Sequence, residues 1–268
     1  MSIKRIGLIG TGNMGSAMVK GWIKADPAMV ERITIADAIP STAKRLAKET
    51  GVAVANSNLE LVEGSDLVVI AVKPGDIEHA LDGCLEQFGR GKILVSVAAG
   101  RTVISLESIF PVDVAVVRLM PNVAAEVNAG TICFASGNNV DPQTEEDVAE
   151  LFRPLGRVIV LSEKLFAAAT AISGSGPGFV ALFADAFIDG GVMAGLPAPI
   201  ARELTVTMLY GTAKLLMDQG LLPSELRHKV TSPAGTTASG IAQLERDGAR
   251  SAIIDAVQVA AGRAKELG

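Results

Sequence analysis

The sequence contains few of the residues on which many active sites depend. Aromatic residues make up only 4% of its 268 residues, and there are two cysteines and two histidines. Cys84 and Cys133 lie far apart and do not have the spacing of metal ligands. We therefore expect buried free thiols in a reducing compartment and no metal site. Neither metal catalysis nor a cysteine–histidine pair is indicated.

Basic residues are not in excess either. The 24 lysines and arginines are outnumbered by 29 acidic residues, which gives a net charge of −5, and no basic stripe is visible. A nucleic-acid partner is therefore not expected. The first strand is expected to begin within three residues of the N-terminus, which excludes a secretory signal and predicts a cytoplasmic protein.

One stretch without charge, residues 165–184, is long enough to cross a bilayer. Glycine, serine and proline interrupt it at residues 173–178, and much of the remainder is alanine. Helices that are apolar around most of their surface are usually buried in a protein or an oligomer. We therefore expect no membrane span here, but a helix that packs closely against other helices.

Glycine is abundant, and near the N-terminus it follows a pattern. Residues 10–15 have the form G-x-G-x-x-G and lie between an apolar run at 3–9 and a segment with helical spacing at 16–23. In such a strand–loop–helix, the first glycine makes the tight turn, the second lets the backbone approach a pyrophosphate, and the third lets helix and strand pack closely. The residues expected to bind a dinucleotide cofactor here are Gly10, Gly12, Asn13, Met14 and Gly15.

The next predicted strand, residues 32–37, ends in Asp37, which lies 22 residues after Gly15. An acid at about this distance hydrogen-bonds the adenosine ribose of NAD and disfavours the 2′-phosphate of NADP. However, Lys44 and Arg45 are close in the sequence and could meet a phosphate. The expected cofactor is NADH or NADPH, with NADH slightly favoured.

Strands and helices alternate up to about residue 162, and the remainder is helical. The expected strands are 3–9, 32–37, 52–54, 66–72, 93–97, 114–118, 131–135 and 157–160. The expected helices are 16–23, 41–50, 59–63, 77–85, 145–151, 179–192, 199–217, 224–229, 237–246 and 250–265. Apolar strands separated by helices indicate a parallel sheet covered on both faces. This predicts an α/β protein with a dinucleotide-binding domain at 1–162 and a helical domain at 163–268.

Ligands of such sheets lie beyond the carboxyl ends of the strands. Small residues and prolines follow several of these ends and would let a cofactor approach the backbone. The candidates for cofactor binding are Ala71, Val72, Lys73, Pro74, Ala98, Pro121 and Asn122. Lys73 has an equal alternative as a solvated lysine at a strand end. Asn58 either hydrogen-bonds the adenosine ribose or caps the helix that follows it.

A second anion-binding pattern lies near the C-terminus. Residues 231–239 are rich in small hydroxyl residues and run directly into an amphipathic helical pattern. A helix start carries unpaired N–H groups and a partial positive charge, which suit a carboxylate or phosphate. The alternative is an ordinary turn and helix cap, and the glycine loop at the other end of the chain shifts the balance toward a ligand site.

Together these motifs resemble the Δ1-pyrroline-5-carboxylate reductase family over the whole chain. The matching segments are 10–15, 67–74, 96–100, 120–122, 170–177 (Thr-Ala-Ile-Ser-Gly-Ser-Gly-Pro) and 231–237. The resemblance implies an N-terminal Rossmann-type parallel sheet with a C-terminal all-α dimerisation domain. It further implies reduction of a cyclic imine to L-proline by NAD(P)H, and a homodimer with a shared active site. Assembly of dimers into a larger oligomer stays open.

On this basis the substrate carboxylate is expected on the backbone N–H groups at residues 235–237. The substrate-binding residues are Ser232, Gly235, Thr236 and Thr237, and Thr237 is also the expected catalytic residue. The proton donor to the imine is not identified. Four places depart from the family pattern, one of them a residue pair, and no role is assigned to any of them: Ala167, Gly178-Phe179, Leu222 and Ala234.

Two alternatives remain. Another small-substrate reductase, such as a 3-hydroxyacid dehydrogenase, would carry a catalytic lysine after a glycine pair, and residues 174–185 contain no lysine. A cofactor-sensing regulator without turnover would keep the glycine loop but would not need a second anion site. An assay of NAD(P)H oxidation with pyrroline-5-carboxylate separates all three.

Overall fold

The structure is a computed structural model that describes residues 3–89, 91–110 and 113–266. The chain divides into two compact units. Unit 1 consists of the described residues of 1–174 and 260–268, and unit 2 consists of Ser175–Val259.

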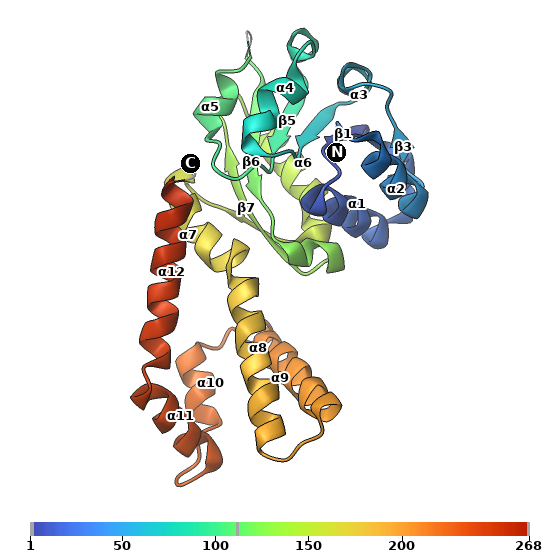
Figure 1. Cartoon of the computed structure of the whole chain (residues 1–268). Helices are drawn as coiled ribbons and strands as arrows, with labels where there is room; N and C mark the ends of the chain where they lie inside the picture. The colour runs from blue at the N-terminus through green and yellow to red at the C-terminus, as the bar shows by residue number, and fades with distance from the viewer. Residues whose placement is uncertain (1–2, 90, 111–112, 267–268) are drawn as a thin grey trace. The chain divides into compact units, whose positions relative to one another are not determined.

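Unit 1 is built on an eight-stranded sheet in the order β3-β2-β1-β4-β5-β6-β7-β8 (Figure 1). The strands are β1 Ile6–Ile9, β2 Ile33–Ala36, β3 Ala53–Val54, β4 Leu67–Ile70, β5 Ile93–Ser96, β6 Ala115–Met120, β7 Gly130–Ser136 and β8 Gly156–Val160. The first six have the strand order 3-2-1-4-5-6 of a doubly wound dinucleotide-binding sheet. The chain order reverses between β1 and β4, which defines the switch point.

Helices connect these strands. They are α1 Asn13–Ala25, α2 Pro40–Thr50, α3 Asn58–Gly64, α4 Ile77–Leu81, α5 Val103–Glu107 and α6 Pro142–Phe152, with short 3-10 turns between them. Alternate residues of one strand enter different hydrophobic clusters: Leu67 and Val69 belong to one, and Val68 and Ile70 to the other. The sheet is therefore covered on both faces, as the apolar strands predicted.

A tryptophan fixes the helix that carries the glycine loop. Trp22 of α1 is 1% exposed, donates a hydrogen bond from Nε1 to the Leu151 carbonyl at 2.8 Å, and meets Phe152 edge to face at 5.2 Å. Gly21 lies beside it, and a Cβ there would meet the Ala125 carbonyl oxygen at 2.6 Å. Truncating a buried tryptophan typically costs about 3–5 kcal/mol. The last turns of α1, the helix that begins at the cofactor motif, are thus anchored in the core.

The expectation of a parallel sheet is wrong for one pair, because β7 runs antiparallel to β6. Residues 121–129 connect them, and a parallel crossover needs about a dozen residues or more. The predicted helix 77–85 ends at Leu81, after which Gly83 takes a φ of +70°. The short helix α5 was not predicted. The remaining strands and helices of unit 1 lie where the sequence placed them, with shifted ends.

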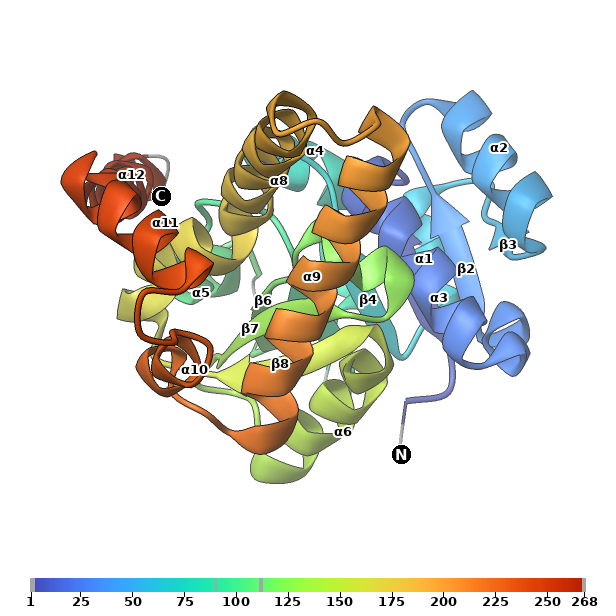
Figure 2. The same ribbon diagram turned by 90° about the horizontal axis from the view of Figure 1, so that it is seen from below.

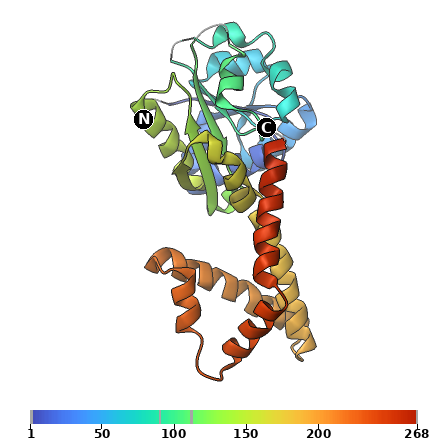
Figure 3. The ribbon, with the colours of Figure 1, turned by 90° about the vertical axis from the view of Figure 1, so that its left-hand side faces the viewer.

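Unit 2 is helical throughout, as predicted. Its helices are α8 Gly176–Met193, α9 Ala198–Gln219, α10 Pro223–Lys229, α11 Thr236–Arg246 and the first part of α12 Ala249–Glu266. Helices α8 and α9 are packed against each other and joined by a short loop (Figure 2). Helices α10 and α11 follow along the chain, and the loop at residues 230–235, which belongs to the second anion-binding pattern, joins them (Figure 3).

The apolar helix predicted around residues 165–184 is present. Residues 163–193 form one helical run that is long and apolar enough to cross a membrane by length and composition. Within a single chain its α8 part has no buried residue, and Leu182, Phe187 and Met193 are more than half exposed. An exposed apolar surface of this kind marks an interaction site.

Candidate functional site

The carboxyl ends of the central strands lie in register at one edge of the sheet. Ile9 pairs with Ala36 on one side and with Ile70 on the other, and Ile70 pairs with Ser96. The segments that follow these strands therefore emerge side by side. The sequence-predicted cofactor residues of unit 1 come from these segments, together with Asn58 after β3.

The glycine loop has the geometry that its motif predicts. Gly10 has a φ of +101°, and a Cβ there would meet the Ala71 carbonyl at 2.7 Å. At Gly15 a Cβ would lie 2.0 Å from the Gly10 carbonyl oxygen, so helix and strand are in close contact. Gly12 is exposed and has no heavy atom within 4 Å of such a Cβ. The space above Gly12 is open, which fits a pyrophosphate lying against the backbone.

Asp37 holds this loop in place. Its Oδ2 accepts hydrogen bonds from the Thr11 N–H at 2.7 Å and from the Thr11 hydroxyl at 2.8 Å, and its Oδ1 accepts one from the Ile39 N–H at 2.8 Å. Partial burial acts to raise the pKa of Asp37, but these hydrogen bonds outweigh it and leave that pKa below its ordinary value. Asp37 is therefore a carboxylate at neutral pH that links the ends of β1 and β2.

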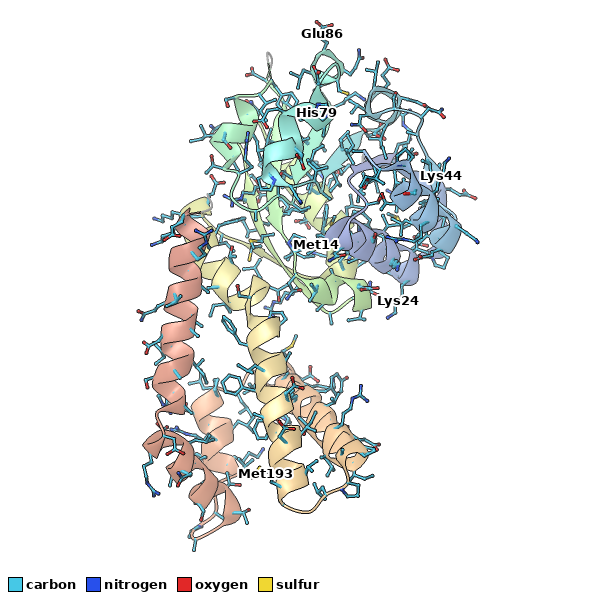
Figure 4. All side chains as sticks on the ribbon, in the orientation of Figure 1. Met14, Lys24, Lys44, His79, Glu86 and Met193 are labelled. Atoms are coloured by element: carbon cyan, nitrogen blue, oxygen red, sulfur yellow. The ribbon has the colours of Figure 1, made fainter. Side chains whose placement is uncertain are left out.

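One cavity borders the glycine loop and a second borders Asp37, and the neighbouring cations Arg45 and Lys44 line different ones. A cavity of about 910 Å³, here called the loop cavity, is lined by Gly12, Asn13, Met14 and Arg45, among others. A second cavity of about 410 Å³, here called the Asp37 cavity, is lined by Asp37, Lys44, Asn56 and Asn58, among others. Figure 4 places Met14 at the start of α1 and Lys44 on α2. Consecutive residues of α2 thus serve different cavities.

The remaining candidates after β3 and β4 differ in their exposure and in whether their side chains are already hydrogen-bonded. Asn58 lines the Asp37 cavity, and its Nδ2 donates to the Ala80 carbonyl at 2.9 Å. The helix is capped by Ser57, whose hydroxyl accepts from the Glu60 N–H, so the alternative role of Asn58 as a cap is wrong. Lys73 is exposed and begins a 3-10 turn, while Ala71, Val72 and Pro74 are half-buried.

The ends of β5 and β6 carry the last candidates of unit 1. Ala98 is 5% exposed, Pro121 is buried, and Asn122 is half-buried. Asn122 uses both polar atoms of its amide: Nδ2 donates to the Ser173 carbonyl at 3.0 Å, and Oδ1 accepts from the Thr131 N–H at 3.1 Å.

The second anion-binding pattern forms a loop and helix start in unit 2. Helix α11 begins at Thr236 with Gly235 as its N-cap residue, and no side chain caps it. Within the described part of the chain, the N–H groups of Thr236, Thr237 and Ala238 have no hydrogen-bond acceptor. Thr237 occupies the second helical position, so the alternative that its hydroxyl merely caps the helix is wrong. These donors suit an anion.

The loop before α11 is tightly folded. Ala234 has a φ of +56°, in the left-handed region that favours glycine. A Cβ at Gly235 would lie 2.3 Å from the Ser232 hydroxyl oxygen, so any larger residue would displace that hydroxyl. The Gly235 N–H donates to the Ser232 carbonyl at 3.1 Å. The turn therefore brings Ser232 next to the start of the helix.

Sequence reasoning missed two features that border the site in unit 1. Thr170–Gly174 form a π-helical turn, which contains part of the family motif. Arg118 of β6, 8% exposed, pairs with Glu163 at 2.7 Å and lies over the Phe166 ring at 4.6 Å. A lone arginine in an apolar strand was a signal for such a buried pair. Both thiols, Cys84 and Cys133, are free and buried as predicted, and the described residues contain no group of three or more potential metal ligands.

Comparisons with known proteins agree with these motifs. A family model described as pyrroline-5-carboxylate reductase dimerisation matches residues 163–267, and one described as NADP oxidoreductase, coenzyme F420-dependent, matches residues 5–100. A pyrroline-5-carboxylate reductase of Methanosarcina acetivorans is 37% identical over 268 residues, covering 100% of this chain and 99% of the relative. Pyrroline-5-carboxylate reductase 3 of Danio rerio is 38% identical, covering 98% and 91%.

Solved structures give the same result. A pyrroline carboxylate reductase of Plasmodium falciparum with NADP bound superposes with a TM-score of 0.89 at 29% identity, covering 100% of this chain and 99% of that one. A pyrroline-5-carboxylate reductase of Coxiella burnetii gives a TM-score of 0.91 at 30% identity, covering 99% and 98%.

A doubly wound sheet with a glycine loop at its switch point, joined to a helical unit, defines an NAD(P)-dependent oxidoreductase of two parts. The two relatives above, which match this chain over nearly its full length, are both pyrroline-5-carboxylate reductases. The chain belongs to the pyrroline-5-carboxylate reductase family. The resemblance and the fold class predicted from the sequence are thereby confirmed, apart from the antiparallel β6–β7 pair.

Proposed function

We propose that this protein reduces Δ1-pyrroline-5-carboxylate to L-proline with NAD(P)H. The observation that carries the proposal is the presence of two anion-binding loops on one chain: the glycine loop at residues 10–15 and the loop at residues 232–237. A dinucleotide occupies the first, and the second suits a small carboxylate. A regulator that only senses the cofactor has no use for the second loop.

The residues present fit a dinucleotide. The open space above Gly12 and the packed glycines on either side leave a bare backbone for the pyrophosphate. We assign the pyrophosphate to residues 10–15, the adenosine to Asp37 and Asn58, and the nicotinamide side to the segments at 71–74, 98 and 121–122. When bound, the cofactor supplies a hydride to the C=N carbon, and the protein supplies position and exclusion of water.

We assign the substrate carboxylate to the start of α11. The free N–H groups of Thr236 and Thr237 donate to it, and the Ser232 and Thr237 hydroxyls add further hydrogen bonds. The helix N-terminus adds a favourable partial charge of about +0.5. Gly235 supports this arrangement because a side chain there would push the Ser232 hydroxyl out of its position. Thr237 is the residue in this set that we assign to catalysis, where it orients the ring.

NADH is the proposed preferred cofactor. The Asp37 carboxylate lines its cavity as an anion, since its pKa lies below the ordinary value. It opposes a 2′-phosphate, while Lys44 in the same cavity acts in the opposite direction. The charge nearest the loop is thus acidic, which tips the balance toward NADH.

We further propose a cytoplasmic homodimer built by the helical domain at 163–268, with a dinucleotide-binding domain at 1–162. The exposed apolar surface of α8 supports dimerisation over membrane insertion, because glycine and proline interrupt the apolar stretch at both ends of the helix. These residues are Gly174, Gly176, Pro177 and Gly178 at its start and Gly190 and Gly191 near its end. We propose no nucleic-acid partner, given the net charge of −5.

The test is oxidation of NADH and NADPH, followed by absorbance, with and without pyrroline-5-carboxylate, together with detection of proline. Substrate-dependent oxidation with proline as product is expected. If the folded protein binds NADH but oxidises neither cofactor with this substrate, the proposed function is wrong.

A further inference from the structure

Asn122 lies just after the end of β6, and its side chain supplies a hydrogen-bond acceptor where the backbone pairing with β7 stops. The last paired residues of β6 and β7 are Met120 and Cys133. The next residue, Pro121, has no N–H and cannot extend the ladder. The Asn122 Oδ1 instead accepts the hydrogen bond of the Thr131 N–H at 3.1 Å. The side chain thereby continues the pairing of β7 after the backbone of β6 has left it.

The other end of the same amide holds the π-helical turn. The Asn122 Nδ2 donates to the Ser173 carbonyl at 3.0 Å. Both segments belong to unit 1. A second contact between them joins the Thr170 hydroxyl to the sulfur of Met120 at 2.8 Å. Residues at the end of β6 therefore contact both the first part of the turn, at Thr170, and its last part, at Ser173.

The turn at Thr170–Gly174 is π-helical, and its own hydroxyl groups bond the preceding helical turn. Single π-helical turns are rare and occur often at functional sites. The Ser173 hydroxyl donates to the Ala169 carbonyl at 2.8 Å, and the Thr170 hydroxyl donates to the Phe166 carbonyl at 2.7 Å. Asn122, together with the contact between Met120 and Thr170, ties this turn to the strand end assigned to the nicotinamide side. The chain passes directly from the turn through Ser175 into α8.

We propose that Asn122 is a positioning residue for hydride transfer, which sets the π-helical turn against the end of β6 by its hydrogen bond to the Ser173 carbonyl. This proposal rests on the proposed function. It differs from the sequence-based expectation that Asn122 binds the cofactor, because one N–H of Nδ2 and the Oδ1 atom already bond backbone groups that fix the side chain. Its effect is on the rate of the chemical step and not on the affinity for NADH.

The chain offers a matched control. Asn128, also half-buried, donates from Nδ2 to the carbonyls of Gly21 at 2.8 Å and Pro154 at 2.7 Å. It joins structural segments away from the π-helical turn. Because its φ is +61°, the control is Asn128→Gly, which keeps the left-handed backbone. Loss of its hydrogen bonds should lower the melting temperature without changing kcat.

Two variants of Asn122 distinguish the hydrogen bond made by Oδ1 from the one made by Nδ2. Asn122→Ala removes both hydrogen bonds. Asn122→Asp keeps an acceptor for the Thr131 N–H but places an oxygen against the Ser173 carbonyl. We expect kcat to fall by about ten- to hundredfold in both variants, the cost of a misplacement of about 1 Å. The KM and the Kd for NADH should stay within about twofold of wild type.

The kinetic isotope effect adds a readout that stability does not influence. With NADH carrying deuterium at both C4 positions, the isotope effect on kcat should rise in Asn122→Ala, because hydride transfer becomes slower than product release. The Asn128→Gly control should retain the wild-type effect. Melting temperatures measured on all variants show that each is folded.

Each other outcome overturns the proposal. A raised Kd for NADH with unchanged kcat makes Asn122 a cofactor contact. A lowered melting temperature with wild-type kinetics, as for Asn128→Gly, makes it purely structural. Full activity of Asn122→Asp shows that the bond to Ser173 is not the important one. A wild-type enzyme that binds NADH but does not reduce pyrroline-5-carboxylate fails earlier and refutes the proposed function instead.

Discussion

Asp37 has two tasks in this structure, and replacing it with serine separates them. Its carboxylate accepts three hydrogen bonds, two from Thr11 and one from the Ile39 N–H, and also lines the cavity assigned to adenosine. A serine hydroxyl is too short to reach both partners. We therefore expect Asp37→Ser to loosen the glycine loop and to remove the charge that opposes a 2′-phosphate.

The two effects differ in which cofactor they touch. A hydrogen bond to a charged group contributes about 1.5–3 kcal/mol, so loosening the loop should lower kcat/KM for both cofactors by about tenfold or more. Relief of charge repulsion helps NADPH alone, and a shift of about 1.4 kcal/mol moves the NADPH-to-NADH ratio about tenfold. The assay is the ratio of the kcat/KM values, measured at low ionic strength.

Thr11→Ala is the matched control. It removes the hydroxyl bond to Asp37 and leaves the charge and the Thr11 N–H bond in place. Both cofactors should weaken equally, with an unchanged ratio. If Asp37→Ser also leaves the ratio unchanged, Asp37 acts only through the loop and does not face the ribose. If the control shifts the ratio as much, charge repulsion is not the cause of the preference.

The pH dependence follows from the same contacts. The pKa of Asp37 is lowered in the folded protein, because its hydrogen bonds outweigh partial burial. A depressed folded pKa gives stabilisation that is present above the unfolded value of about 3.9 and is lost as the pH falls through the folded value. NADH affinity should therefore stay constant between about pH 5 and 8 as far as Asp37 is concerned. A loss of affinity centred near pH 5–6 that disappears in Asp37→Ser would contradict this.

Other predictions test the remaining contacts. Thr237→Ala should raise the KM for the imine, consistent with about 1.5–3 kcal/mol for one bond to a carboxylate, and should lower kcat because Thr237 also orients the ring. The melting temperature should change little because its hydroxyl caps nothing; a normal KM would remove its role in substrate binding, and an unchanged kcat its role in catalysis. Ala234→Gly should stabilise the protein by about 0.5–1 kcal/mol in thermal unfolding, since it relieves a left-handed alanine, whereas Ala238→Gly in the following helix should cost about 1 kcal/mol. Lys44→Ala should weaken NADPH more than NADH, while Arg45→Ala should weaken both alike, because the two residues line different cavities; equal effects of the two variants would refute that division.

Much of the fold follows from local pattern. The apolar strands and the glycine loop could be located because each depends on residues within one short segment, as the backbone of Gly10 and Gly15 shows. The direction of β7 depends instead on the length of residues 121–129, a property of the connection and not of the strand. Strand composition alone cannot reveal it.

The candidate site divides in the same way. Residue types and spacing were enough to select Asp37, but not to show that its carboxylate is occupied by Thr11 and Ile39. Likewise Asn122 was selected for its place after a strand, whereas its hydrogen bond to Ser173 joins residues 51 positions apart. Such long-range contacts depend on tertiary packing, which no short motif encodes. The sequence is therefore enough to predict which residues belong to the site, whereas the role of each residue follows only from the structure.

The two halves of the proposed site differ in how completely a single chain orders them. In unit 1 the decisive polar groups, Asp37 and Asn122, already have backbone partners, so the cofactor side is preorganised. In unit 2 the N–H groups at the start of α11 have no acceptor within the described chain, and α8 has no buried residue. Order on the substrate side must therefore come from what binds there: the carboxylate at the helix start and a second copy of the chain along the apolar helix. This predicts that cofactor affinity is a property of one chain, whereas turnover depends on the dimer. Dilution should abolish catalysis at concentrations where NADH still binds, and a monomer with full turnover would contradict the argument.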